Sequence, residues 1–161
     1  MIRIMETKGI PVVCMKDDSR IGYIDVPVYD KDGNSAGFFA EIKGSLLGRR
    51  FIDIRDILKI DGKACVIYSE RNVKKRREAG SVKPTCKQKK LVGKKVTLRD
   101  GGGLGVVRDL MFNAETGAIE GIEISRGVYD DLSRGRRTLL LRDCAEIGED
   151  GIIVSDEGGL L

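Results

Sequence analysis

The sequence contains Gly48-Arg49-Arg50-Phe51-Ile52-Asp53-Ile54-Arg55-Asp56-Ile57-Leu58-Lys59-Ile60, and a later stretch aligns with it without a gap. That stretch is Gly135-Arg136-Arg137-Thr138-Leu139-Leu140-Leu141-Arg142-Asp143-Cys144-Ala145-Glu146-Ile147. Both begin with a glycine and two arginines, continue with an apolar run and then reach an Arg-Asp pair. An internal repeat governs the interpretation of the whole chain, because each copy is expected to form the same structural unit.

The register of the repeat extends on both sides of these stretches. Downstream, Cys65-Val66-Ile67-Tyr68-Ser69-Glu70 falls on Ile152-Ile153-Val154-Ser155-Asp156-Glu157. Upstream, Ile21-Gly22-Tyr23-Ile24 matches Leu104-Gly105-Val106-Val107. The sequence therefore predicts a first domain at 1–70, a linker at 71–90, a second domain at 91–157 and a short tail at 158–161.

Each copy has the pattern of short strands joined by tight turns. Val96-Thr97-Leu98 is an apolar run that stops at a polar and glycine-rich cluster, and residues 119–125 alternate between apolar and polar side chains. Asn113 and Gly117 suit the backbone of a hairpin loop. Many short strands favour an all-β fold, and closure into a small barrel removes exposed strand edges. Pro27, which has no N–H, is expected at a strand edge or a bulge.

Composition excludes many enzyme classes. The chain has no histidine, which is the usual acid-base catalyst near neutral pH and the commonest metal ligand. The four cysteines lie far apart and form no C-x-x-C pair, so neither a zinc site nor a redox motif is indicated. No segment has the length and apolar character of a membrane span or a signal peptide. We therefore expect a cytoplasmic protein with reduced thiols that act as small core residues.

The glycine and apolar positions of both copies resemble the PRC-barrel family. The resemblance is clearest in Leu91-Val92-Gly93-Lys94-Lys95-Val96, in Gly103-Leu104-Gly105-Val106-Val107-Arg108-Asp109-Leu110 and in the closing Ile152-Ile153-Val154. The first copy is similar but more diverged. The resemblance implies two tandem small β-barrels, related to the cytoplasmic domain of the photosynthetic reaction centre H subunit and to the C-terminal domain of the ribosome maturation factor RimM. It implies an adaptor or assembly role and supplies no active site and no cofactor.

The linker concentrates the positive charge of the chain. Residues 71–90 hold nine Lys or Arg and one acid, whereas the whole chain has a net charge of +4. Such a segment is expected to be a solvated, extended spacer, although it also suits contact with RNA, a ribosome, an anionic membrane surface or an acidic protein. The candidate contact residues are Arg71, Lys74, Lys75, Arg76, Arg77, Lys83, Lys87, Lys89 and Lys90.

Three other features have simpler structural interpretations. Gly101-Gly102-Gly103-Leu104-Gly105 lacks the Gly-Lys-Ser/Thr of a phosphate loop and predicts a tight turn. The aspartates at 17–18, 30, 32 and 130–131 lack calcium-loop spacing and predict polar turns. The Arg-Asp pairs at 55–56 and 142–143 occupy equivalent corners and predict a repeated turn or ion pair.

These observations lead to one main functional hypothesis and one alternative. The main hypothesis is a non-enzymatic adaptor that binds another macromolecule, expected to be a protein, through barrel surfaces. A homodimer also fits, because small sheets readily add partners. The alternative is an RNA- or ribosome-associated factor that uses the basic linker.

Overall fold

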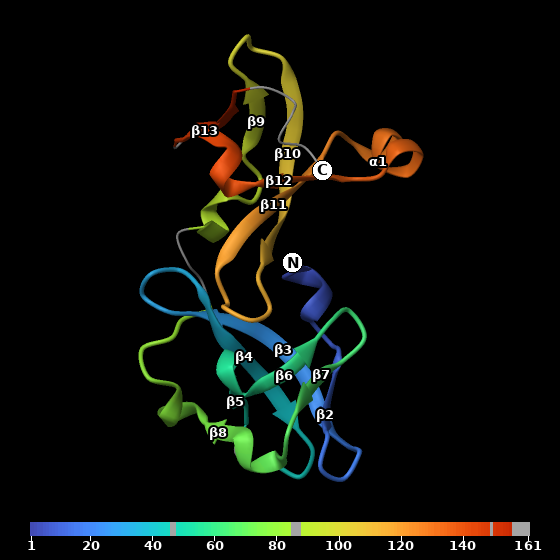
Figure 1. The fold of residues 1–161 in the computed structure, drawn as a ribbon, viewed down its shortest axis with the longest axis vertical. Helices are drawn as coiled ribbons and strands as arrows, with labels where there is room; N and C mark the ends of the chain where they lie inside the picture. Colours follow the sequence, from blue (N-terminus) through green and yellow to red (C-terminus); the bar gives the residue numbers. More distant parts are fainter. Residues whose placement is uncertain (46–47, 85–87, 149, 156–161) are drawn as a thin grey trace. The chain divides into compact units, whose positions relative to one another are not determined.

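The computed structural model describes residues 1–45, 48–84, 88–148 and 150–155. The chain forms two compact units. The N-terminal unit comprises Ile2–Cys86 together with Phe112–Ile119, and the C-terminal unit comprises Met1, Lys87–Met111 and Glu120–Leu161. Each unit is built on one curled antiparallel sheet with a single parallel strand pair, shown in blue to green and in yellow to red in Figure 1. The expected all-β class with two barrel-like units is confirmed.

The N-terminal sheet has the strand order β6-β7-β2-β3-β4-β5-β8. Within it, β2 and β7 are parallel and the other neighbours are antiparallel. Its strands are β2 (Pro11–Cys14), β3 (Ser19–Tyr29), β4 (Ser35–Ile42), β5 (Arg50–Asp53), β6 (Ile57–Ile60), β7 (Cys65–Ile67) and β8 (Val73–Lys75).

The C-terminal sheet has the order β12-β11-β10-β9-β14-β13, which repeats the order of the first sheet from β5 to β6. The parallel pair recurs as β9 and β14. Its strands are β9 (Lys95–Leu98), β10 (Gly103–Phe112), β11 (Ile119–Ser125), β12 (Arg137–Leu140), β13 (Cys144–Ile147) and β14 (Gly151–Val154). A short strand, β1 (Ile2–Arg3), lies off this order.

The repeated stretches of the sequence form the same elements in the same register. In the first copy β5 leads into the 3₁₀ turn η2 (Ile54–Asp56) and then β6, and in the second copy β12 leads into η6 (Leu141–Asp143) and then β13. Each of these elements begins and ends at the residue that the ungapped alignment assigns. Ile52 and Leu139 are both fully buried, as are Val12 and Val96. The repeat therefore reflects equivalent backbone paths and equivalent core positions.

Pro27 lies where the strand pairing of β3 allows a residue without an N–H. β2 pairs with β3 only as far as Tyr23, and the β3–β4 register shifts between Ile24 and Val26. The N–H of Tyr29 points away from β4, because it donates to the carbonyl of Lys83 at 2.8 Å. A second register shift lies between Val28 and Tyr29, so Pro27 lies between two irregularities of the β3–β4 pairing, where a residue without an N–H is tolerated. The expected position beside a bulge is confirmed.

The remaining elements are short helices. The 3₁₀ turns η1 (Met5–Thr7), η3 (Glu70–Asn72) and η4 (Arg76–Ala79) belong to the N-terminal unit, and η5 (Gln88–Leu91) belongs to the C-terminal unit. The only α-helix of the described residues is α1 (Val128–Arg134), which projects from the strands of the C-terminal sheet (Figure 1, orange). The strand pattern did not predict this helix.

Candidate interaction surfaces

The predicted linker, residues 71–90, is called the basic segment below. Its described part does not form the extended spacer that its charge predicts. Residues 70–79 form η3, β8 and η4, and β8 pairs with β5 through Val73 opposite Ile52. The physical reason is apolar burial, because Ala79 and Val82 pack against a cluster of Val28, Phe39 and Phe51. The segment therefore covers one side of the N-terminal sheet.

Among the candidate contact residues with described side chains, Lys74 and Arg76 make side-chain contacts inside the N-terminal unit. The ammonium of Lys74 lies 2.9 Å from Asp56 and 3.5 Å from Asp53. The hydrogen bond to Asp56 raises the pKa of Lys74. The guanidinium of Arg76 lies over the ring of Phe39 at 5.5 Å from its centroid, within cation–π range. The two carboxylates compensate the charge of Lys74, whereas Arg76 keeps its charge.

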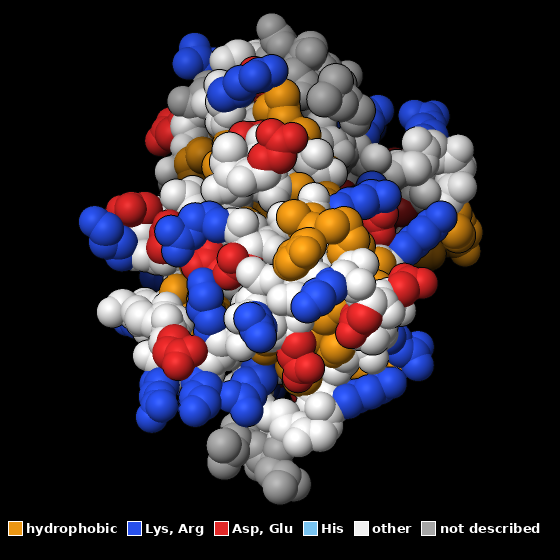
Figure 2. Space-filling model, turned by 60° about the horizontal axis from the view of Figure 1, so that its bottom comes forward, with side chains coloured by type: hydrophobic (Ala, Val, Ile, Leu, Met, Phe, Trp, Pro, Cys, Tyr) orange, Lys and Arg blue, Asp and Glu red, His pale blue; other side chains and the backbone are white. Residues whose placement is uncertain are grey.

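The other candidates keep their side chains exposed or fall outside the described part of the chain. Arg71, Lys75, Arg77, Lys83 and Lys90 are exposed. Lys87 lies outside the described residues, as does the side chain of Lys89. On the face drawn in Figure 2, Lys and Arg side chains alternate with Asp, Glu and apolar groups. The surface there is of mixed charge rather than a continuous basic patch.

The corner of the first copy contains an ion pair with a partner that the repeat did not predict. Arg55 donates to Asp53 through Nε at 2.9 Å and through Nη2 at 2.6 Å. Asp56 instead forms an ion pair with the ammonium of Lys74. In the second copy Arg142 lies 3.8 Å from Asp143. Asp53 becomes Leu140 in the second copy, so the bidentate pair cannot form there. The repeated turn is confirmed, and the ion pairs of the two corners differ.

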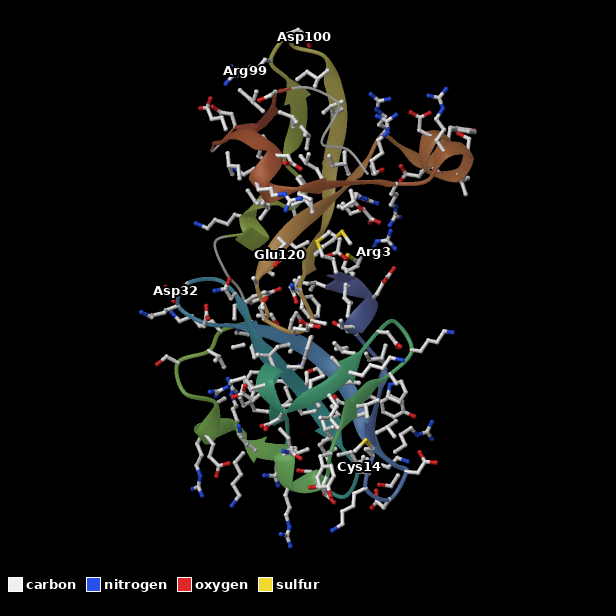
Figure 3. All side chains as sticks on the ribbon, viewed as in Figure 1. Arg3, Cys14, Asp32, Arg99, Asp100 and Glu120 are labelled. Atoms are coloured by element: carbon white, nitrogen blue, oxygen red, sulfur yellow. The ribbon has the colours of Figure 1, made fainter. Side chains whose placement is uncertain are left out.

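The glycine-rich stretch and the cysteines are structural. Arg99 and Asp100 mark the tip of the β9–β10 turn in Figure 3, where Leu98 donates its N–H to the carbonyl of Gly102 at 2.8 Å. The tight-turn interpretation is confirmed. Burial raises the pKa of the Cys65 thiol to about 12, and burial likewise raises the pKa of Cys14, so both thiols stay protonated at neutral pH. Cys86 lies outside the described residues.

Among the described residues of the C-terminal unit, the most exposed apolar side chains lie on α1. Val128, Tyr129 and Leu132 are 74%, 91% and 82% exposed. The helix interrupts a loop between Gly127 and Gly135, which both have a positive φ. The i, i+4 spacing of Val128 and Leu132 was the available sequence signal, but it spans barely one turn and was missed. Large apolar side chains grouped at a surface are typical of a protein-binding site.

Ion pairs hold the loop that carries α1. Asp131 accepts from the hydroxyl of Ser125 at 2.7 Å and from Nε of Arg136 at 3.2 Å. Arg136 also donates to the buried carboxylate of Glu123 at 3.0 Å. Arg126 donates to the carbonyl of Leu104 at 3.2 Å. These contacts fix both ends of the loop to β10 and β11, so the exposed apolar face of α1 is held in place.

A groove lies between this loop and β10. Its lining includes the apolar side chains of Val106, Val128 and Leu132 and the charged side chains of Arg108, Arg126, Asp131 and Arg136. Apolar groups beside an excess of cations suit a protein segment with apolar and acidic side chains. In the described residues, no group of three or more His, Cys, Asp or Glu side chains could hold a metal ion. No helix in the described part of the chain has the length and hydrophobicity needed to cross a membrane.

The fold defines a mostly β protein of two barrel-like units, and the exposed groups described above are candidate interaction surfaces. Residues 87–161 match the family model of the PRC-barrel domain. The expected resemblance to this family is confirmed for that part of the chain. No curated protein matches the chain. PRC-barrel domains are generally non-enzymatic and are often interaction modules.

Proposed function

We propose that this chain is a non-enzymatic, cytoplasmic adaptor or assembly protein that binds another protein through its barrel surfaces. The observation that carries this proposal is the exposed apolar face of α1, formed by Val128, Tyr129 and Leu132. Burial of these side chains in a partner would remove apolar surface from water, which is the main favourable term in protein association. The proposal also takes residues 1–70 as a diverged second copy of the domain, supported by the shared strand order of the two sheets.

Site-specific crosslinking tests the proposal. A photoreactive amino acid replaces Tyr129 in the full chain expressed in its native cells, and a control protein carries it at Tyr68, which is 53% exposed in the N-terminal unit. We expect a discrete protein adduct from position 129 that is absent from position 68. Leu132→Glu should abolish that adduct without changing stability, because Leu132 is 82% exposed. The same adducts from both positions, or none from position 129, would contradict the proposal.

The alternative is RNA or ribosome contact through the basic segment, which relates the chain functionally to RimM. Its support is the set of exposed cations that make no ion pair among the described contacts, including Lys75, Arg77 and Lys83. The test measures binding of a fluorescent single-stranded RNA against salt concentration. The triple variant Lys75→Gln, Arg77→Gln and Lys83→Gln should flatten the salt slope by about 0.7 for each phosphate that the variant no longer neutralises.

A charge-matched control separates this effect from net charge. Lys16, Lys31 and Lys63 are also exposed, and their replacement by Gln removes the same charge elsewhere. Equal slopes for the two triple variants would reject the RNA alternative and leave the adaptor proposal in place.

A further inference from the structure

The two copies differ at one edge of their sheets. In the N-terminal unit, β5 has β4 on one side and β8 on the other. In the C-terminal unit, the equivalent strand β12 pairs with β11. Over residues 1–45, 48–84, 88–148 and 150–155, no strand pairs with its other side. Among the described residues, the edge that the first copy fills with its own chain therefore has no paired strand in the second copy.

The first copy shows what a strand at this edge does. β8 runs antiparallel to β5, with Val73, Lys74 and Lys75 opposite Ile52, Phe51 and Arg50. With β8 paired along this edge, the last three residues of β5 are buried. In β12 only Leu139 is buried, and its neighbours are half-buried. An uncovered strand presents free N–H and C=O groups, which form a template for an added strand.

The side chains around β12 indicate what the added strand should contain. Of the two carboxylates that bind Lys74 in the first copy, Asp53 is replaced by Leu140 and Asp56 is retained as Asp143, which lies 3.8 Å from Arg142. The residue that takes the place of Lys74 would therefore meet an apolar side chain where the first copy has one of its two carboxylates. The place of Lys75 lies opposite Arg137, close in sequence to Arg134 and Arg136. Arg136 already pairs with Glu123 and Asp131, so Arg137, with Arg134 near it in sequence, is the residue that favours a carboxylate in the added strand.

We propose that the edge of β12 binds an extended segment of a partner protein as an antiparallel strand. The segment has an apolar residue opposite Thr138 and a carboxylate opposite Arg137. This inference rests on the proposed function, since it takes the partner to be a protein, and it adds the mode of binding and the chemistry of the bound segment.

A peptide derived from the first copy tests the inference. The probe has the sequence of residues 70–79 of this chain with the changes Lys74→Val and Lys75→Glu, and it is titrated into the full chain. We expect slower hydrogen exchange at backbone amides of β12, because amides in a strand ladder are protected. Arg137→Glu should weaken this peptide about tenfold, and a peptide that keeps Lys75 should recover the loss on that variant.

N-methylation of the peptide distinguishes strand addition from side-chain docking. Alternate amides of an added strand face β12, so methylation of one alternate set should weaken binding at least tenfold while methylation of the other set changes little. Equal effects of the two sets would overturn the inference. So would slow exchange of every β12 amide before peptide is added, since the chain itself would then fill the edge. A Tyr129 adduct without any peptide binding would overturn this inference and leave the proposed function intact.

Discussion

Asp53 lies at the start of the corner turn of the first copy, where its carboxylate serves three groups. It accepts from the N–H of Arg55 at 3.0 Å, from the guanidinium of Arg55 and from the ammonium of Lys74. The hydrogen bonds from Arg55 lower the pKa of Asp53 to about 2. A carboxylate with a lowered pKa stabilises the fold only while it is ionised.

Asp53→Asn should therefore destabilise the protein in a pH-dependent way. The folded pKa lies below the unfolded value, so the contribution of Asp53 is complete above about pH 5 and is lost as the pH falls from about 4 to 2. We expect a loss of about 1–2 kcal/mol at pH 6, reduced because Arg55 is largely exposed. Urea unfolding at several pH values measures it. Asp32→Asn, at an exposed turn, is the control and should change stability little.

Gly22 and Gly105 are equivalent glycines whose role is close backbone approach. A Cβ at Gly22 would lie 2.0 Å from the carbonyl oxygen of Glu41, and one at Gly105 would lie 2.3 Å from that of Ser125. Because no side chain fits at either position, the repeated glycine in the two copies follows from how tightly adjacent strands approach.

Gly105→Ala should cost about 2 kcal/mol or more, because it combines overlap with a φ of +134°. Gly103→Ala in the same strand is the matched control, since a Cβ there has no neighbour within 4 Å. Thermal unfolding of both variants measures the difference. Equal melting temperatures for the two variants would contradict the close-approach explanation.

At the scale of elements, β8 shows how a charged segment becomes part of a sheet. Its composition predicted a solvated spacer, because charge density is visible in sequence and strand pairing is not. Two small apolar residues that are isolated in the sequence, Ala79 and Val82, hold the segment. Their role is visible only in the structure, where they pack against the cluster of Val28, Phe39 and Phe51. Helix α1 was missed for a related reason, since seven residues give too short a period to distinguish a helix from a loop.

Lys74→Met should destabilise the N-terminal unit by about 1 kcal/mol, because Asp53 and Asp56 would then face each other without their shared cation. The pKa of Asp53 should rise in this variant, which carboxyl NMR titration can follow. Lys75→Met removes the same charge from an exposed position of the same strand. A stability loss as large in Lys75→Met as in Lys74→Met would show that net charge, rather than the ion pairs, matters.

At the scale of the whole molecule, the sequence predicted the fold well because the internal repeat presents each pattern of strands and turns twice. The all-β class, the corner turns, the glycine-rich hairpin and the bulge at Pro27 all follow from local rules of spacing and backbone chemistry. The sequence predicted the candidate interaction surfaces less well. The exposure of Tyr129 and the position of β12 at the end of the described sheet depend on which segments lie beside them, and sequence spacing does not define these neighbours.

The family match and the compact units divide the chain differently. Residues 87–161 match the family, but Phe112–Ile119 belongs to the N-terminal unit, where Phe112 is fully buried and its ring lies 6.0 Å from that of Phe38. A fragment of 87–161 should therefore expose Phe112 and bind a hydrophobic dye that the full chain does not bind. Phe112→Thr in the fragment should reduce that binding, and dye fluorescence with size-exclusion chromatography tests both. A monomeric fragment that binds no dye would contradict this expectation.

The segment Phe112–Ile119, which the matched range 87–161 includes but which belongs to the N-terminal unit, also affects any transfer of the family domain into another protein. A graft that begins at residue 87 would carry the apolar side chain of Phe112 into the host protein, which has no apolar surface to bury it. A successful graft would shorten that segment to a polar two-residue turn, or bring the receiving surface along with it.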